Sequence, residues 1–98
     1  MLENPLLPHL ATLLDVVDLT PDVKLFKIEL IDQKVRDNFR YKPGQFIFIS
    51  DFGTGESPFG LASVDYRNGP LEVAVRRVGT VTKSLHELEA GAIVGVRG

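Results

Sequence analysis

The sequence predicts a mainly all-β fold, a small six-stranded antiparallel Greek-key barrel with one short capping helix. Three observations favour this class. The 98 residues are enough for one domain, short apolar runs alternate with polar residues, and glycine or proline separates the runs. Only one stretch has the longer repeat of an amphipathic helix, so strands dominate the predicted fold.

The first predicted strand covers residues 11–19, which are rich in leucine and β-branched side chains. Residues 1–10 contain two prolines and are expected to form an extended arm, so the domain proper is assigned to residues 11–98. A proline in residues 20–22 favours a turn, and the second predicted strand follows at residues 23–31.

The alternation of apolar residues slips within this second strand. Val23 and Leu25 share one face, whereas Phe26, Ile28 and Leu30 share the other. Because side chains alternate strictly along a regular strand, the slip requires a bulge or a sharp bend. We therefore expect the second strand to bend as it curls around the barrel.

Four further strands follow from the remaining apolar runs, which lie at residues 45–50, 59–63, 71–76 and 93–96. The polar residues 32–42 predict an excursion with a helical turn near residues 35–39. Asn68 and Gly69 together form a hairpin signal.

The capping helix is predicted from Val81, Leu85 and Leu88, which fall on one helical face. A threonine on either side of Val81 is suited to cap the start of the helix, and Gly91 is placed to follow its end.

Composition excludes several classes of function. The net charge of −2 offers no basic stripe for nucleic acid, and no apolar run approaches the ~20 residues of a membrane span. The N-terminus does not resemble a signal peptide, so a cytoplasmic location is expected. Without cysteine, the chain itself forms no disulfide, thiolate zinc site or cysteine-bound cluster. His9 and His86 lack further ligands at metal spacing and are expected at the surface.

Three segments in order resemble the flavin-binding segments of ferredoxin-NADP reductase-like domains. Residues 41–46 resemble the Pro-Gly-Gln-Phe entry to the flavin-facing strand, and residues 57–63 lie in the register of an Arg-x-Tyr/Phe-Ser motif. Residues 75–82 resemble the phosphate-binding strand, glycine turn and helix start. The sequences of these segments are most similar to those of gamma subunits of cytoplasmic hydrogenase or sulfur reductase complexes, and next to that of the electron-transfer subunit of dihydroorotate dehydrogenase.

The resemblance implies that FAD is the cofactor. The implied cofactor-binding residues are Ser57, Pro58, Phe59, Gly60, Val75, Arg76, Gly79, Thr80, Val81 and Thr82. Phe59 occupies the aromatic position and is expected to stack on the flavin ring, since offset aromatic pairs gain ~0.5–1.5 kcal/mol beyond burial. The alternative is that Phe59 is an ordinary core phenylalanine.

The diphosphate of FAD needs backbone donors and positive charge. Residues 79–82 precede a helix, where free N–H groups and the positive end of the dipole favour anions. We expect Gly79 to allow a close approach, Thr82 to add a hydroxyl donor, and Arg76 to reach a phosphate from the outer face. The alternatives are an ordinary helix cap and a solvated arginine.

Two residues depart from the motif. Ser57 stands in place of the arginine that contacts the diphosphate, and Gly60 in place of the serine at the flavin ring. The first change removes a charge-assisted contact of about 1.5–3 kcal/mol, for which Arg76 and Arg77 are expected to compensate.

Two other candidates are weaker. Asp51 and Glu56 flank a glycine loop, but nothing marks them as an acid–base pair. Residues 53–55 are too short for a phosphate loop.

In the resembling family, NAD(P)H reduces the flavin, which passes single electrons to an iron–sulfur partner. The implied partners are an NAD(P)-binding domain of the same parent chain and iron–sulfur or hydrogenase-type subunits. We therefore expect the 98 residues to be a fragment that turns over nothing by itself. The alternative from another class is a non-catalytic β-barrel protein-interaction module, with a flavin site decayed at Ser57 and Gly60.

Overall fold

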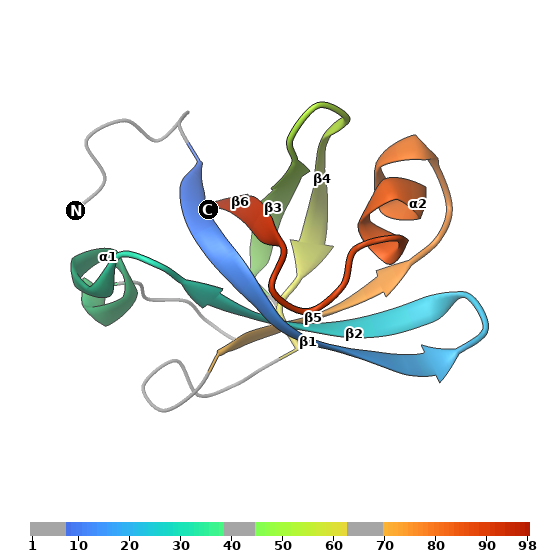
Figure 1. Ribbon diagram of the computed structural model, residues 1–98, viewed down its shortest axis with the longest axis horizontal. Helices are drawn as coiled ribbons and strands as arrows, with labels where there is room; N and C mark the ends of the chain where they lie inside the picture. Colours follow the sequence, from blue (N-terminus) through green and yellow to red (C-terminus); the bar gives the residue numbers. More distant parts are fainter. Residues whose placement is uncertain (1–7, 39–44, 63–69) are drawn as a thin grey trace.

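The computed structural model describes residues 8–38, 45–62 and 70–98, and these contain six strands and two helices. The strands are β1 (His9–Thr20), β2 (Val23–Leu30), β3 (Phe46–Asp51), β4 (Gly55–Gly60), β5 (Leu71–Arg76) and β6 (Ile93–Arg97). The helices are α1 (Gln33–Asn38) and α2 (Thr80–His86). Figure 1 shows α2 next to the hairpin of β3 and β4.

The strands pair in the order β4-β3-β6-β1-β2-β5, and every pairing among the described strands is antiparallel. The last strand, β6, enters between β1 and β3, which makes the connection a Greek key. The two ends of the order meet at a single bridge between Leu61 and Val73, so the sheet closes on itself. The predicted six-stranded antiparallel barrel is confirmed.

The predicted bend lies in a different strand. β2 pairs regularly with β5 from Val23 to Ile28, so the expected bulge in the second strand is wrong. Two shifts occur instead in β1. Leu13 pairs with Ile28 but Asp15 pairs with Lys27, and a second shift lies between Asp18 and Thr20 near the hairpin turn. An extra residue in one strand bends that strand and increases its twist. The bulge at Leu14 therefore supplies the curvature that the slipped alternation of β2 had indicated.

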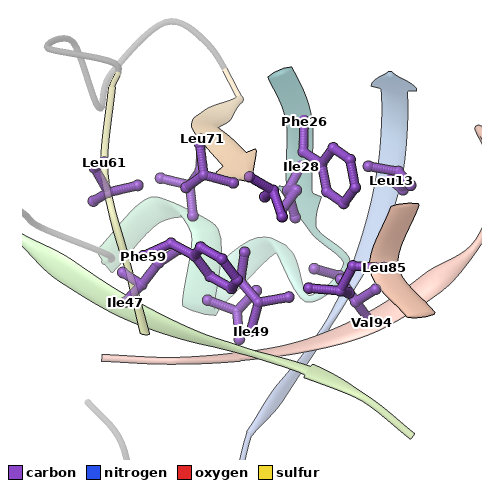
Figure 2. Packing of buried hydrophobic residues seen from close by; sticks show 14 of the residues in the cluster. Leu13, Phe26, Ile28, Ile47, Ile49, Phe59, Leu61, Leu71, Leu85 and Val94 are labelled. Atoms are coloured by element: carbon purple, nitrogen blue, oxygen red, sulfur yellow. The ribbon is translucent and has the colours of Figure 1, made fainter. Parts of the chain in front are cut away.

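Inward-facing side chains of the strands form one core, in which Phe26 is the largest fully buried residue. Leu71, Val73 and Val75 of β5 face inward as predicted. Figure 2 shows Leu85 of α2 within the same cluster. Among the described residues, eleven apolar side chains have 0% exposure, which gives the barrel a continuous apolar interior.

Several boundaries differ from the prediction. β1 begins at His9, inside the expected arm, and α1 confirms the helical turn expected near residues 35–39. β4 begins at Gly55 rather than at residue 59. It tolerates Pro58 because its ladder runs along β3 alone, so one side of the strand needs no donor. The Asn68-Gly69 hairpin signal lies outside the described residues.

Candidate functional site

The site residues predicted from the sequence lie on either side of one discontinuity in the barrel. In the described part of the chain, β4 and β5 are joined only at the Leu61–Val73 bridge and by the Ala62 N–H, which donates to the Glu72 carbonyl at 2.7 Å. Away from this bridge, α2 contacts both strands. We call this place, with β4 on one side and β5 and α2 on the other, the β4–β5 seam.

On the β4 side, Ser57 is half-buried and Pro58 and Gly60 are exposed. Phe59 is only 8% exposed and belongs to the core. Figure 2 shows its ring beside Ile47 and Ile49. Stacking on a flavin would need one open face of this ring, and core side chains cover it here. The structure therefore supports the alternative, that Phe59 is a core phenylalanine.

An exposed aromatic ring lies close to Gly60. Phe46 is 65% exposed, and a Cβ at Gly60 would lie 3.8 Å from its Cε1 atom. The two residues pair directly across β3 and β4. Phe46 is not among the cofactor-binding residues predicted from the sequence, although its alternation with the buried Ile47 places it on the outer face. Phe46 therefore offers an exposed aromatic ring, whereas the ring of Phe59 is buried.

Thr82, on the α2 side, has a different role from the one predicted. It is 6% exposed, and its Oγ1 accepts hydrogen bonds from the Val78 N–H at 2.8 Å and the Gly79 N–H at 2.9 Å. Its hydroxyl donates back to the Gly79 carbonyl at 3.1 Å. The side chain closes the turn before α2, so the expected hydroxyl donor to a phosphate does not fit.

The N–H groups of the first turn of α2 have no hydrogen-bond acceptor within the helix. The Lys83 N–H donates to the Gly79 carbonyl at 2.8 Å, which is the first turn-closing bond of α2. The N–H groups of Thr80, Val81 and Thr82 precede it and have no carbonyl one turn earlier to accept them. A Cβ at Gly79 would meet no described atom within 4 Å, so this backbone is open to close approach.

The two arginines at the end of β5 point to different neighbours. Arg76 is exposed on the outer face, as predicted, with its Nε 3.6 Å from an Asp22 carboxylate oxygen. A hydrogen bond from the Thr20 hydroxyl, and less strongly the charges of Arg76 and Arg77, lower the pKa of Asp22.

Arg77 contributes to the helix start instead. An open groove of about 620 Å³ is lined by Arg77, Val78, Gly79, Thr80 and Lys83. It thus combines first-turn amides with two cations. Arg77 is predicted from the sequence only as a compensating residue, and Lys83 is not predicted at all, because helical phase alone does not show which groove a side chain borders.

A second groove, of about 490 Å³, adjoins the first through Arg77 and Lys83. It runs between α2 and the turn of the β1–β2 hairpin, where Leu19, Pro21 and Lys24 line it. Our prediction that His86 lies on the surface is wrong. It is 8% exposed, and its Nε2 lies 2.6 Å from the Val75 carbonyl oxygen.

Neither metal chemistry nor a membrane helix has support in the described residues. Across residues 8–38, 45–62 and 70–98, no three histidine, aspartate or glutamate side chains gather as metal ligands. The helices in the same ranges are too short to cross a membrane.

Known proteins resemble the chain along most of its length. The family model described as "Oxidoreductase FAD-binding domain" matches residues 10–98. The sulfhydrogenase 2 subunit gamma of Pyrococcus furiosus is 39% identical over 95 residues, covering 97% of this chain and 33% of that protein. A probable dihydroorotate dehydrogenase B (NAD(+)), electron transfer subunit, of Methanocaldococcus jannaschii is 35% identical over 91 residues, covering 93% and 30%. The chain spans about a third of the length of these relatives.

Solved structures share the architecture. The ferredoxin reductase in carbazole 1,9a-dioxygenase superposes with a TM-score of 0.80 at 22% identity, covering 99% of this chain and 29% of that one. The cytochrome b5 reductase domain of Ulva prolifera nitrate reductase gives 0.75 at 20% identity, covering 97% and 40%. At these identities the likeness establishes the fold alone.

Proposed function

The chain belongs to the oxidoreductase FAD-binding domain family, and from this premise we propose that it holds the flavin of an NAD(P)H-dependent electron-transfer protein. FAD is its cofactor, and the resemblance found in the sequence to ferredoxin-NADP reductase-like domains is confirmed. The observation that carries the proposal is the family match over residues 10–98, which includes both sides of the β4–β5 seam.

The residues at the start of α2 fit a diphosphate. Two phosphate groups need donors and positive charge, and the groove beside Gly79 offers backbone amides together with Arg77 and Lys83. A guanidinium is suited to two phosphate oxygens at once. We therefore assign phosphate binding to residues 79–82 through their backbone and to Arg77 through its side chain. Arg76 contributes less, since it faces Asp22.

The β4 side is assigned to the flavin ring. Ser57, Pro58 and Gly60 lie along β4, and the exposed ring of Phe46 on the neighbouring strand β3 lies next to Gly60. A strand rises by about 3.3 Å per residue, so β4 provides an elongated surface between the α2 region and Phe46. When bound, FAD would supply the redox chemistry, in which two electrons are accepted together and passed on one at a time. The protein supplies binding, orientation and exclusion of water.

The remaining parts of the reaction belong to the rest of a longer protein and to its partners. The relatives are named as a subunit gamma and an electron transfer subunit, and each is about three times as long as this chain. These names support an NAD(P)-binding domain in the same parent chain and electron transfer to iron–sulfur or hydrogenase-type subunits. A cytoplasmic location is part of the same proposal, because NAD(P)H is the proposed electron donor.

Titration of the 98-residue chain with FAD tests the proposal. We expect saturable one-to-one binding by isothermal calorimetry, with quenching of flavin fluorescence in the same concentration range. Circular dichroism on the same sample verifies the fold. A folded chain that leaves both signals unchanged contradicts the proposal. It would favour the alternative, a protein-interaction barrel with a decayed site at Ser57 and Gly60.

A further inference from the structure

Helix α2 is too short to fix its own position. It has seven residues, and isolated helices shorter than about 12–15 residues are marginal in water. Its place across the β4–β5 seam must therefore come from contacts with the barrel. Because α2 presents the amides and the cation Lys83 of the phosphate groove, whatever places α2 also places these groups.

The β5 side of the seam supplies one anchor. The ring of His86 bonds the Val75 carbonyl through Nε2, and the Nζ of Lys24 donates to the His86 carbonyl at 2.9 Å. Both contacts are at the last turn of α2 and hold it against β5 and β2.

The turn between β3 and β4 supplies the other anchor. The Ser84 hydroxyl donates to a carboxylate oxygen of Asp51, and Thr54 Oγ1 lies 3.2 Å from Ser84 Oγ. The Thr54 N–H in turn donates to the Asp51 carbonyl at 2.9 Å, which fixes the turn. A Cβ at Gly55 would lie only 3.3 Å from Val81 Cγ2, so the turn packs directly against α2.

The second anchor reaches the phosphate-binding end of the helix. Val81 and Ser84 are three residues apart and share one helical face, and this face meets the β3–β4 turn. Val81 also carries one of the open first-turn amides. A loosened Asp51–Ser84 contact thus lets the start of α2 move relative to β4, whereas the His86 anchor keeps the far end in place.

We propose that Asp51 and Ser84 are positioning residues that set α2 across the β4–β5 seam and thereby determine the affinity for the diphosphate part of FAD. This inference rests on the proposed function. It assigns a role to the glycine-rich turn at residues 53–55, where Gly55 lets the chain approach the helix. It also assigns a role to Asp51, which nothing in the sequence marks as a member of an acid–base pair with Glu56.

The test compares Asp51→Asn and Ser84→Ala with the unchanged chain in titrations of FAD, ADP and riboflavin. ADP carries the diphosphate without the ring, and riboflavin carries the ring without phosphate. Asp51→Asn replaces the charged acceptor by a neutral amide oxygen, and Ser84→Ala removes the donor. In both variants the charge-assisted hydrogen bond is lost, so we expect FAD and ADP to bind about tenfold more weakly. Riboflavin affinity should change less than twofold. Ser84→Thr keeps the hydroxyl and should retain most of the affinity for FAD.

Glu56→Gln is the matched control, because it neutralises a carboxylate of the neighbouring strand that bonds Arg97 rather than α2. Its affinity for FAD should stay within twofold of the unchanged chain. Equal weakening of FAD and riboflavin in the Asp51 and Ser84 variants, or unaltered FAD binding in both, overturns the inference alone. Failure of the unchanged chain to bind FAD overturns the proposed function as well, and this result is distinct from the other two.

Discussion

The two sides of the barrel use their polar groups differently. From β4 through β3, β6, β1 and β2 to β5, the strands form an uninterrupted ladder, and Arg97 and Glu56 pair across the outer face at 2.6 Å. At the β4–β5 seam, a single bridge joins the strands. There, the first-turn amides of α2 have no helical acceptor, and Arg77 and Lys83 have no ion-pair partner among the described residues.

The difference separates residues that hold the fold from residues available to a ligand. On the continuous side, neighbouring strands pair along the ladder and Arg97 pairs with Glu56, so substitutions there should change stability first. Donors at the seam are directed outward, so substitutions there should change cofactor affinity with little effect on folding. Two pairs of variants and one single variant can break or sharpen this division.

The largest expected effect is at Gly95, on the continuous side. An added Cβ would lie 2.8 Å from Pro8 Cβ and 3.1 Å from Phe52 Cζ, so Gly95→Ala should lower the free energy of unfolding by about 1–3 kcal/mol. An added Cβ at Gly79 would meet no described atom within 4 Å. Gly79→Ala should therefore lower the free energy of unfolding by less than about 1 kcal/mol while weakening FAD binding. Chemical denaturation measures both. Equal losses of stability would contradict the division.

The next effect is on affinity. Arg77→Gln removes a guanidinium from the phosphate groove and should weaken FAD binding about tenfold, whereas Arg76→Gln makes the same change of charge beside Asp22 and should weaken it less than threefold. Calorimetric titration at low and high salt checks both, since salt should narrow the difference. A larger loss from Arg76→Gln would restore the role first predicted for Arg76.

The smallest effect is a pH dependence on the outer face. The hydrogen bond from Arg97, and also its charge, lower the pKa of Glu56. A carboxyl group whose pKa is lowered in the folded state stabilises the fold at pH values above the ordinary glutamate pKa. This stabilisation disappears as the pH falls through the lowered pKa. Glu56→Gln should therefore melt at a lower temperature than the unchanged chain at neutral pH, and the two melting temperatures should converge in acid. A constant difference across pH would show that the pair contributes no charge-dependent stability.

Much of the fold could be predicted from local pattern. The strand at residues 71–76 agrees residue for residue, because its strict alternation has one buried face. The bulge was assigned to the wrong strand for a physical reason. A slipped alternation shows that the register changes between two partners, but pairing decides which partner carries the extra residue.

The site was only partly predictable. The sequence identified the two segments that meet at the seam, but it did not distinguish the inward face of β4 from the outward face. Phe59 was therefore selected, although Phe46 carries the exposed ring. Thr82 shows a second limit, because a threonine at a helix start can bond a ligand or its own turn. Only the three-dimensional structure shows which bond forms.

The bulge at Leu14 has a consequence for how the first hairpin can change in length. Leu13 and Val16 both pack against the core although they are three positions apart, whereas residues on one face of a regular strand are an even number of positions apart. The reason is that Leu14 is an extra residue of β1 with no partner in β2. Removing Leu14 would keep both neighbours on the interior side, since they would then be two positions apart. What would be lost is arc length, because β1 would then match β2 residue for residue from Ala11 to Asp18. The sheet would then straighten at the point where it must turn to meet itself.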